Sequence, residues 1–283
     1  MAVDQYAITT LAALKSYLGI STSTDDAVLE SAIDRASYAI EAYLDRYVVQ
    51  RRVYEWTTAN GGSALVLRHP PIGHVHYVGF GSLACMYVRS TVASDISASV
   101  AITENRLTLV RVASDGTETI TQIQFANHKT TTAIAAQINA TTGFGATLAV
   151  NTTAQRMNRI AGRDLVNAPL TVTFADQAQL DTTADLARGI LYYGRNGYDP
   201  DDGGGYWPNA PISVFVDYDG GWETVPPDIV HACHLIAARI YNGRKRDTGI
   251  QSESFGDYSY TQGVSAEQDA EALRLLSPYK RIR

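Results

Sequence analysis

Three aspartates in the last third of the chain are of the type that binds calcium. Asp199, Asp201 and Asp202 precede a run of glycines at 203–205, and closely spaced carboxylates before a glycine turn are what a calcium loop uses. Such a loop closes with a glutamate at its twelfth position, which here is Ala210. The segment is therefore interpreted as a flexible acidic turn, with ion binding as the alternative.

Two histidine pairs have residue types that zinc chemistry uses. His231 and His234 lie on a predicted helix with Cys233 between them, and His74 and His76 lie on a predicted strand. No HExxH motif and no paired-cysteine motif completes a zinc site. The sequence therefore predicts core or surface histidines, no metal site and no cofactor.

The sequence contains none of the familiar motifs that surround a catalytic nucleophile. It contains no GxSxG elbow, no P-loop and no dinucleotide-binding glycine pattern. Cys85 and Cys233 lie far apart and outside any catalytic motif, so they are expected to be small, reduced core residues without a disulfide. The chain is predicted not to be an enzyme, and a hydrolase is the least favoured function.

A strand, a turn and a helix follow one another after residue 211. Ile212 to Tyr218 alternates as a strand does, Asp219-Gly220-Gly221 turns the chain, and Pro226-Pro227-Asp228 begins a helix. The apolar stripe of this helix is formed by Ile229, Cys233, Ile236 and Ile240. Arg244, Lys245 and Arg246 close it, either as complements of the helix dipole or as a contact to an acidic partner.

The N-terminal part of the chain predicts two more helices. Thr9 or Thr10 caps a short one that stops at Gly19, and residues 21–25 lead into a longer one. The longer helix has an apolar stripe at the helical period that includes Leu29, Ile33, Ile40 and Leu44.

Between residues 86 and 185 the composition shifts toward Thr, Ala, Ser and Asn. The strands expected there are 100–103, 107–112, 119–125, 147–150 and 170–174. They are interrupted by one helix, which Thr130 to Thr132 can cap and which Ile134 and Ile138 line. This length is enough for a small β-rich domain of its own.

The C-terminal tail is polar and rich in glycine between residues 248 and 263, which predicts either disorder or an extended partner contact. Tyr258 and Tyr260 have no core of their own there, so contact with a neighbouring subunit is expected. Ser265 and Gln268 form a capping box before Leu273, Leu275 and Leu276. A helix this short is marginal alone and is expected to dock onto a partner.

Two blocks of the sequence, about 6–80 and 186–263, resemble the head-tail connector (adaptor) proteins of tailed bacteriophages. The residues that carry the resemblance are ITTLAALKSYLGISTSTDDAVLESAIDRASYAIEAYLDRY, LVLRHPPIGHV and VDYDGGWETVPPDIVHACHLIAARIYNGRKRDTGIQSESFGDYSYT. The resemblance implies a small helical protein that forms a ring beneath the portal, usually twelve-fold, and extends the DNA channel toward the tail. No reaction is implied. The insertion resembles a small β-α-β module of phage structural proteins.

The expected fold is α+β, with a small helical bundle made of the N-terminal helices and one C-terminal helix. A helical connector core is expected at 1–85 and 186–263, a β-rich insertion domain at 86–185, and a C-terminal helix and tail at 264–283. The hypothetical portal contacts are Arg244, Lys245, Arg246, Phe255, Tyr258, Tyr260, Leu273, Leu276, Tyr279 and Arg281. The expected core residues are Leu29, Ile33, Ile40, Leu44, Ile229, Cys233, Ile236 and Ile240.

The composition agrees with such a structural protein. Hydrophobic residues make up 45% of the 283 and charged ones 18%, which is ordinary for a globular chain, and no run is apolar enough to span a membrane. A net charge of -6 argues against tight general DNA binding, so DNA is expected to pass without sequence-specific contacts. Tyrosine, with 17 residues against 6 phenylalanines, is typical of interfaces.

The expected partners are therefore the portal, tail or further connector proteins, and other copies of the chain. The expected location is the head-tail interface of a virion, after synthesis in the host cytoplasm. A carbohydrate- or host-surface-binding module carried by the insertion is the alternative, with Tyr206, Trp207 and the aspartates at 199–202 as a sugar platform.

Overall fold

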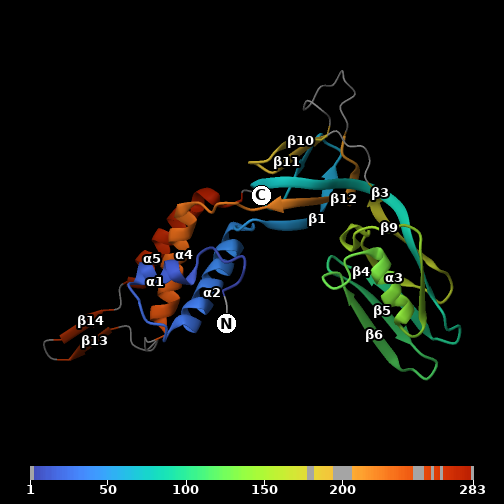
Figure 1. Ribbon diagram of the computed structural model, residues 1–283, viewed down its shortest axis with the longest axis horizontal. Coiled ribbons are helices and arrows are strands. Elements are labelled where there is room, and N and C mark those ends of the chain that lie inside the picture. The colour runs from blue at the N-terminus through green and yellow to red at the C-terminus, as the bar shows by residue number, and fades with distance from the viewer. Residues whose placement is uncertain are drawn as a thin grey trace, which may run out of the picture.

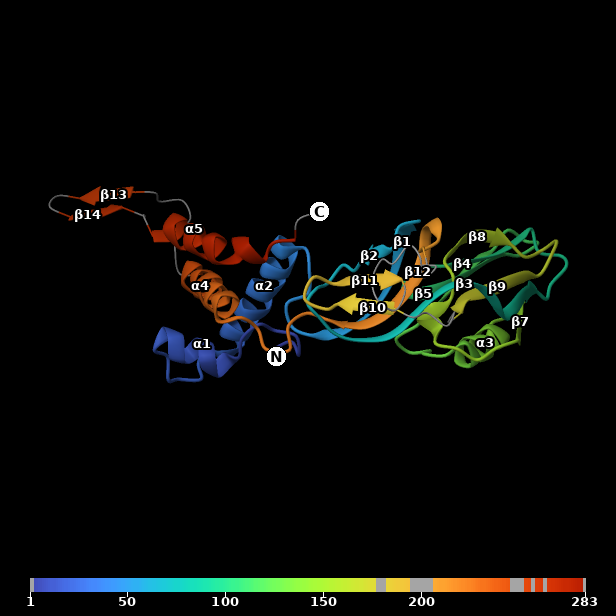
Figure 2. The same cartoon turned by 90° about the horizontal axis from the view of Figure 1, so that it is seen from above.

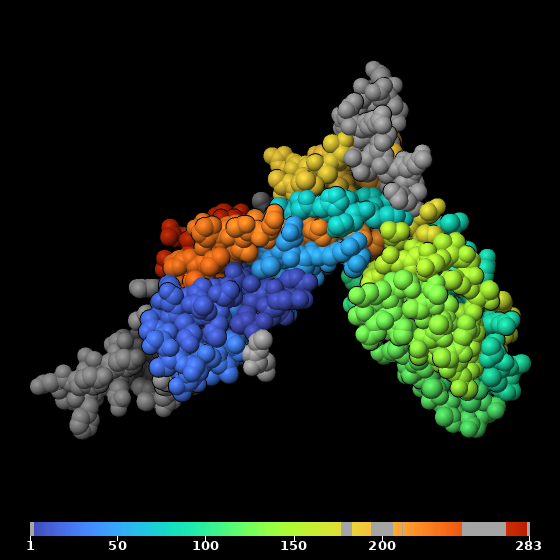
Figure 3. Space-filling view, viewed as in Figure 1, coloured from blue at the N-terminus to red at the C-terminus, as the bar shows by residue number. Residues whose placement is uncertain are grey.

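A computed structural model describes residues 3–176, 182–193, 206–244, 252–255, 258–261 and 264–281. The fold is α+β, as expected. Most of its helices gather at one end, a twisted sheet forms the middle, and a β-rich unit that carries one further helix forms the other end (Figures 1 and 2). The space-filling view shows the helical end and the β-rich end projecting from the same side of the middle, with a hollow between them (Figure 3).

The helical end contains α1 (Leu11–Leu18), α2 (Asp26–Leu44), α4 (Pro227–Gly243) and α5 (Val264–Leu276). The N-terminal signals act as predicted, since the Thr10 hydroxyl accepts from the Ala13 N–H at 3.2 Å and α1 ends at Gly19 in the left-handed region. The four helices pack around one shared apolar cluster.

The apolar stripes of α2 and α4 meet in this cluster. Of the expected core residues, the structure buries Leu29, Ile33, Ile40, Leu44, Ile229 and Cys233 completely. Ile236 and Ile240 are only partly buried at its margin. Leu235 and Ala232 occupy the more enclosed positions on α4, so the buried face is turned slightly from the one expected.

The middle of the molecule is an antiparallel sheet. It contains β1 (Arg51–Asn60), β12 (Asn209–Gly220) and β3 (Ile72–Ser90). Among the described strands β1 pairs with β12 alone, which makes it an edge strand. A small sheet of β2 (Ala64–Val66), β11 (Ile190–Tyr193) and β10 (Thr182–Asp185) contributes to the apolar cluster on one face. Much of the segment 51–85, which was expected to belong to the helical connector core, forms strands, and the strand expected at His74 and His76 is part of β3.

The β-rich end has an apolar core of its own, which extends from Cys85 to Phe174. One sheet contains β6 (Glu118–Gln124), β5 (Arg106–Val112), β4 (Ser97–Ile102) and β8 (Ile160–Asp164). The other is an extension of β3 that pairs with β7 (Phe144–Leu148) and β9 (Leu170–Asp176), and α3 (Thr131–Ala140) packs beside β7. The expected domain boundary at residue 86 thus falls inside the continuous strand β3, and the division into domains stays a prediction.

The turn after β12 is packed against the end of α2 and needs glycine. Gly221 has a φ of +102°, and a Cβ there would lie 3.0 Å from the Val48 carbonyl oxygen. Its N–H donates to the carbonyls of His69 and Pro71 at 3.1 and 2.9 Å. This close approach fixes the helical end against the central sheet.

The C-terminal helix is already docked within the chain. Leu276 is 1% exposed and belongs to the helical core, and α5 lies against α4. The expectation that Leu276 waits for a partner is wrong, because its side chain is covered by this chain's own helices. Before α5, β13 (Ser252–Phe255) and β14 (Tyr258–Thr261) pair as a hairpin that projects beyond the helical end (Figures 1 and 2).

Replacing Ile33 by alanine tests the helical core. We expect the free energy of unfolding of the helical end to fall by about 2–5 kcal/mol, because a fully buried side chain is lost and a cavity remains. Val28→Ala on the same helix removes a side chain that is 42% exposed and should cost less than about 1 kcal/mol. Urea titration followed by helical circular dichroism measures both, and equal losses would contradict the assigned core.

Candidate functional site

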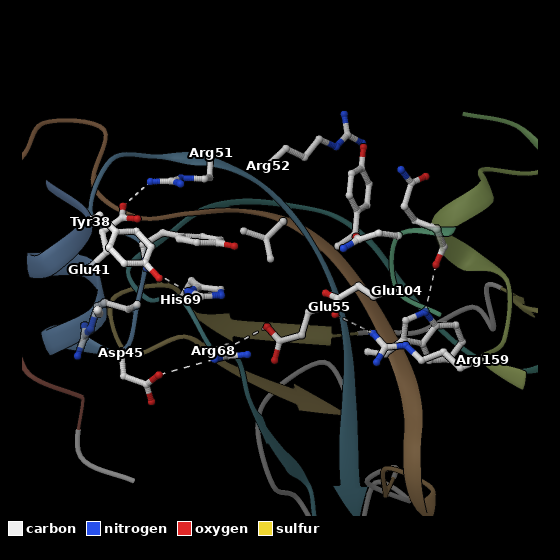
Figure 4. Close-up of a pocket in the computed structure, with 18 residues that line it drawn as sticks. Tyr38, Glu41, Asp45, Arg51, Arg52, Glu55, Arg68, His69, Glu104 and Arg159 are labelled. Atoms are coloured by element: carbon white, nitrogen blue, oxygen red, sulfur yellow. Dashed lines mark hydrogen bonds and ion pairs between the residues drawn. The ribbon is translucent and has the colours of Figure 1, made fainter. Parts of the chain in front are cut away.

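A groove of about 570 Å³ runs along the free edge of β1 (Figure 4). Residues 51–56 of β1 line it consecutively, and we call it the β1 groove. One wall is formed by Tyr38 and Glu41 of α2 and by Asp45, which follows it, and the opposite wall by Glu104 and Arg159 of the β-rich end. The groove therefore lies in the hollow between the two ends of the molecule (Figure 3).

Glu41 closes the helical wall of the groove. Its Oε1 accepts from the Val48 N–H at 3.0 Å and also from the Arg51 guanidinium. Burial raises the pKa of the Glu41 carboxyl, and the Val48 N–H and Arg51 oppose this effect. The carboxylate thus joins the end of α2 to the start of β1, and all of its observed contacts are structural.

His69 is a neutral hydrogen-bond acceptor in the groove. Its Nδ1 accepts from the Tyr47 N–H at 3.0 Å, and the two rings stack with centroids 3.9 Å apart. Burial, and then the positive charge of Arg68, lower the pKa of His69 to about 3. A histidine that stays neutral and is already used as an acceptor is a poor general base at neutral pH.

Glu55 and Tyr218 form a buried pair beneath the groove. The Tyr218 hydroxyl donates to Glu55 Oε2, and the Arg68 N–H donates to the same oxygen at 3.0 Å. Burial raises the pKa of the Glu55 carboxyl, and burial beside Glu55 raises the pKa of the Tyr218 hydroxyl. The pair links β1 to β12 and leaves no free nucleophile.

Arginines on the groove are held by carboxylates. Arg52 makes a bidentate pair with the buried Asp217, at 2.8 Å from Nε to Oδ1 and 2.7 Å from Nη2 to Oδ2. This pairing raises the pKa of Arg52. Arg68 lies 3.7 Å from Asp45, and Arg159 lies 3.6 Å from Glu104. Such a groove offers charge and hydrogen bonding for binding, and its described residues contain no nucleophile beside a matched base.

The far end of the groove is closed by a contact between β1 and the β-rich end. Trp56 Nε1 donates to the Gln155 carbonyl at 3.1 Å, and the Arg156 guanidinium lies 3.4 Å from the centre of the Tyr77 ring. The sequence held a signal for this strand in the β-branched and aromatic residues Val53, Tyr54 and Trp56, which favour strands. The groove itself depends on segments about a hundred residues apart and has no local signal.

Of the predicted partner-contact residues, some make contacts within the chain and others are exposed or lie outside the described residues. Arg244 pairs with Asp25 at 2.8 Å and covers the Tyr241 ring at 4.1 Å, so its contacts are within the chain. Tyr279 meets Trp222 edge-on, and the Arg281 N–H donates to the Leu44 carbonyl at 3.3 Å. Leu273 is exposed. Phe255, Tyr258 and Tyr260 lie in β13 and β14, while Lys245 and Arg246 lie outside the described residues.

Both histidine pairs have roles within the chain. His234 Nε2 lies 2.7 Å from the Thr9 hydroxyl, and its ring stacks on Tyr17. His76 Nε2 lies 2.9 Å from Asp219 Oδ2, and its ring meets His74. Within the described ranges, no three His, Cys, Asp or Glu side chains gather as a metal site would require.

Burial keeps both cysteines in the unreactive thiol form at neutral pH. Both are free thiols, and burial raises the pKa of Cys85 to about 11 and that of Cys233 to about 12.

Trp207 is not available for the sugar platform of the alternative function. Trp207 is 1% exposed, packs in the core beside the small sheet, and donates from Nε1 to the Ser63 carbonyl at 3.0 Å. It is buried because β2 and β11 cover it, so its expected role in sugar binding is wrong. Tyr206 is exposed, and residues 199–202 lie outside the described part of the chain.

Among the described residues, no helix is both long enough and apolar enough to cross a bilayer.

Comparison with known proteins gives a match at the N-terminal end. Residues 8–65 match the family model of the phage gp6-like head-tail connector protein, which confirms the predicted resemblance over this segment. A search of curated proteins found no match.

Solved structures similar to this chain come from gene transfer agent (GTA) particles. A chain from the neck of an empty GTA particle with C6 symmetry is 14% identical, with 100% of this chain and 95% of that chain covered and a TM-score of 0.45. A chain from the virion of the native GTA particle is 16% identical, with coverage of 100% and 94% and a TM-score of 0.42. A third, from the native neck with C12 symmetry, is 15% identical, with coverage of 100% and 93% and a TM-score of 0.40. These scores are too low to assign a shared function.

His69 predicts a pH dependence of stability. Its pKa is about 3 in the folded chain and near 6.5 when unfolded, so below about pH 6.5 the unfolded chain binds a proton that the folded chain does not. This contribution to stability is present above the unfolded pKa and is lost as the pH falls. Between about pH 7 and pH 4.5, we expect the wild type to lose roughly 2.5 kcal/mol more than His69→Asn, whose amide oxygen can still accept from Tyr47. Denaturant titrations at the two pH values measure this difference, and parallel losses would show that His69 is protonated in the folded state.

Proposed function

We propose that this chain is a structural subunit of a head-tail connector in a tailed phage or phage-like particle. The observation that carries the proposal is the match of residues 8–65 to the gp6-like connector family model. The matched segment includes α1, α2, β1 and the start of β2. It therefore supplies half of the helical end and the edge strand of the central sheet.

The contacts of the β1 groove support a structural function. Its buried acids bind arginines, a tyrosine hydroxyl or backbone N–H groups, and His69 is a neutral acceptor. Catalysis requires a group poised to accept or give a proton, or a nucleophile with its base. We propose on this basis that the chain acts by assembly and has no catalytic activity.

The assembly proposed is a ring beneath the portal. Copies of the chain pack side by side, in the expected number of twelve, and the ring extends the DNA channel toward the tail. A head-to-tail interface that closes on itself produces such a ring. The net charge of -6 suits a wall along which DNA passes without being held. The protein is thus made in the host cytoplasm and used at the head-tail interface of the particle.

The portal contact is proposed on the outer face of the C-terminal helix. Leu273 is 48% exposed there, while Leu276 on the inner face is buried in the chain's own core. Arg281 follows the helix and remains a predicted portal contact, although within the chain its charge acts on Arg46, Glu55 and His69. The β-rich end, which has a core of its own, is proposed as an addition to the ring that faces outward or meets tail components.

The carbohydrate-binding alternative is not favoured by any described feature. Its central residue, Trp207, is buried beneath β2 and β11 and presents no face to a sugar ring.

Native mass spectrometry of the purified chain, alone and mixed with its candidate portal, tests the proposal. We expect one closed oligomer with a defined copy number when the portal is present, because ring contacts and portal contacts reinforce each other. The control is a portal from an unrelated phage, which should leave the distribution of masses unchanged. A chain that stays monomeric at all concentrations and ignores the portal would contradict the connector function.

A further inference from the structure

The strand β1 has an unused backbone edge. Its only strand partner is β12, and no backbone hydrogen bond outside that pairing reaches residues 51–60 from any other described residue. The groove side of a strand at a sheet edge presents N–H and C=O groups that can pair with a further strand. Long open edges are rare in stable proteins because they pair with other chains, so this edge is a surface at which a further strand can add.

The dimensions of the β1 groove fit a short strand. The free edge is bounded by Glu41 at Arg51 and by Gln155 at Trp56. At about 3.3 Å per residue, the edge between these two limits is roughly 17 Å long. A four-residue strand, roughly 13 Å long, can lie along it without touching either limit.

The same chain contains a second unpartnered β element. The hairpin of β13 and β14 projects past the helices, and among the described elements its extensive contacts are only between its own two strands (Figures 1 and 2). A single two-stranded hairpin is marginally stable in water, and it becomes stable when another strand or a packing surface is added. Each of its strands is four residues long.

The hairpin cannot reach β1 of its own chain. Thr261 ends β14 only three residues before Val264, so the hairpin starts within about 11 Å of the start of α5. The Tyr279 hydroxyl lies 3.4 Å from Asp228 Oδ2, which places the end of α5 beside the start of α4. The start of α5 therefore lies at least the length of this 13-residue helix, about 20 Å, from the turn that joins α4 to the sheet. The groove begins near that turn and extends away from the helices, so the hairpin must find its partner in another molecule.

We propose that the β13–β14 hairpin of one copy adds to the free edge of β1 in the next copy, inside its β1 groove. This inference rests on the ring of the proposed function and names the contact that links its subunits. The hairpin of one copy binds a different surface, the β1 edge, on the next copy, so the interface is heterologous. Such an interface closes into a ring when the rotation between copies permits.

The residue types of the two partners are complementary. The hairpin strands contain one charged residue, Glu253, together with Phe255, Tyr258 and Tyr260. The groove offers Arg52 and Arg68, whose side chains are more than half exposed, and the ring of Tyr38, which is 77% exposed. Arginine attracts a carboxylate and also stacks on aromatic rings, so both types of hairpin residue have partners there. Backbone pairing supplies the affinity and these contacts supply the specificity.

A peptide titration tests the pairing without requiring a ring. The receptor is the full chain with residues 252–261 replaced by a Gly-Ser linker of equal length, and the probe is a cyclised peptide of residues 251–262. We expect saturable binding, together with slower hydrogen exchange of those amides in residues 51–56 that are not already bonded to β12. A scrambled peptide of the same composition is the control and should not bind.

Two matched variants of the receptor locate the site. Ala42 is exposed on α2 and lines the groove, whereas Ala27 is exposed on the same helix outside it. Ala42→Trp fills the groove and should weaken peptide binding by at least about tenfold. Ala27→Trp should bind as the parent does, and circular dichroism shows whether both variants are folded. Equal binding by the two variants, no binding by the parent, or binding only to the portal would overturn the proposal.

Assembly of full-length proteins separates this inference from the proposed function. Neither the linker variant nor Ala42→Trp should form a ring alone, but mixing them should give a heterodimer through the one intact edge and the one intact hairpin. If the wild type closes into a ring with portal and Ala42→Trp does so equally well, the connector function stands and the hairpin contact is wrong. If the peptide binds at the groove but the wild type forms no ring, the pairing stands and the ring is wrong.

Discussion

The carboxylate of Glu41 fixes the corner between the end of α2 and the start of β1, and the rest of the structure depends on this corner. It binds the Val48 N–H and Arg51 at once, so the end of α2 and the start of β1 have one fixed geometry. Next to it, Trp222 exchanges backbone hydrogen bonds with Val48 and Gln50 at 2.8 and 3.0 Å, and Gly221 permits the close approach. Burying a carboxylate is unfavourable unless it is hydrogen-bonded, and Glu41 meets that condition with two donors. This corner orients the helical end relative to the sheet and thereby shapes one wall of the β1 groove.

The groove is rich in ionisable groups and yet is built for binding. Arg51, Arg52 and Glu55 each hold a partner on another element, and they join α2, β12 and the segment at residues 68–69 to β1. The pKa shifts of Glu41, Glu55 and His69 follow from this burial, since each group is enclosed for structural reasons. Perturbed pKa values also mark catalytic sites, but here the groups are already bonded to one another. The surface left for a partner is the backbone edge of β1, flanked by arginines and aromatic rings.

Separate apolar cores give the molecule its extended form. The helical end, the small sheet with Trp207 and the β-rich end each pack around a cluster of their own. A chain of this length could bury more surface in a single core, so the extended arrangement leaves unusually much surface for contacts with other molecules. That property suits a subunit whose function is to join others, and it explains how an edge strand and a projecting hairpin can both be present in one chain.

The sequence by itself determined the elements whose signals are local. Thr10 and Gly19 mark the ends of the first helix, and Thr130 caps α3. The strands predicted at 107–112 and 170–174 coincide closely with β5 and β9. These signals are local, because caps, glycines and apolar periods act between residues a few positions apart. Only the tertiary structure decided that β1 is an edge strand, that Trp207 and Leu276 are buried, and that the groove exists. These features depend on pairs such as Arg52 with Asp217 and Trp56 with Gln155, which are far apart along the chain. The free energy of such contacts arises from burial and hydrogen bonding between distant segments, and no local pattern of residue types contains that information.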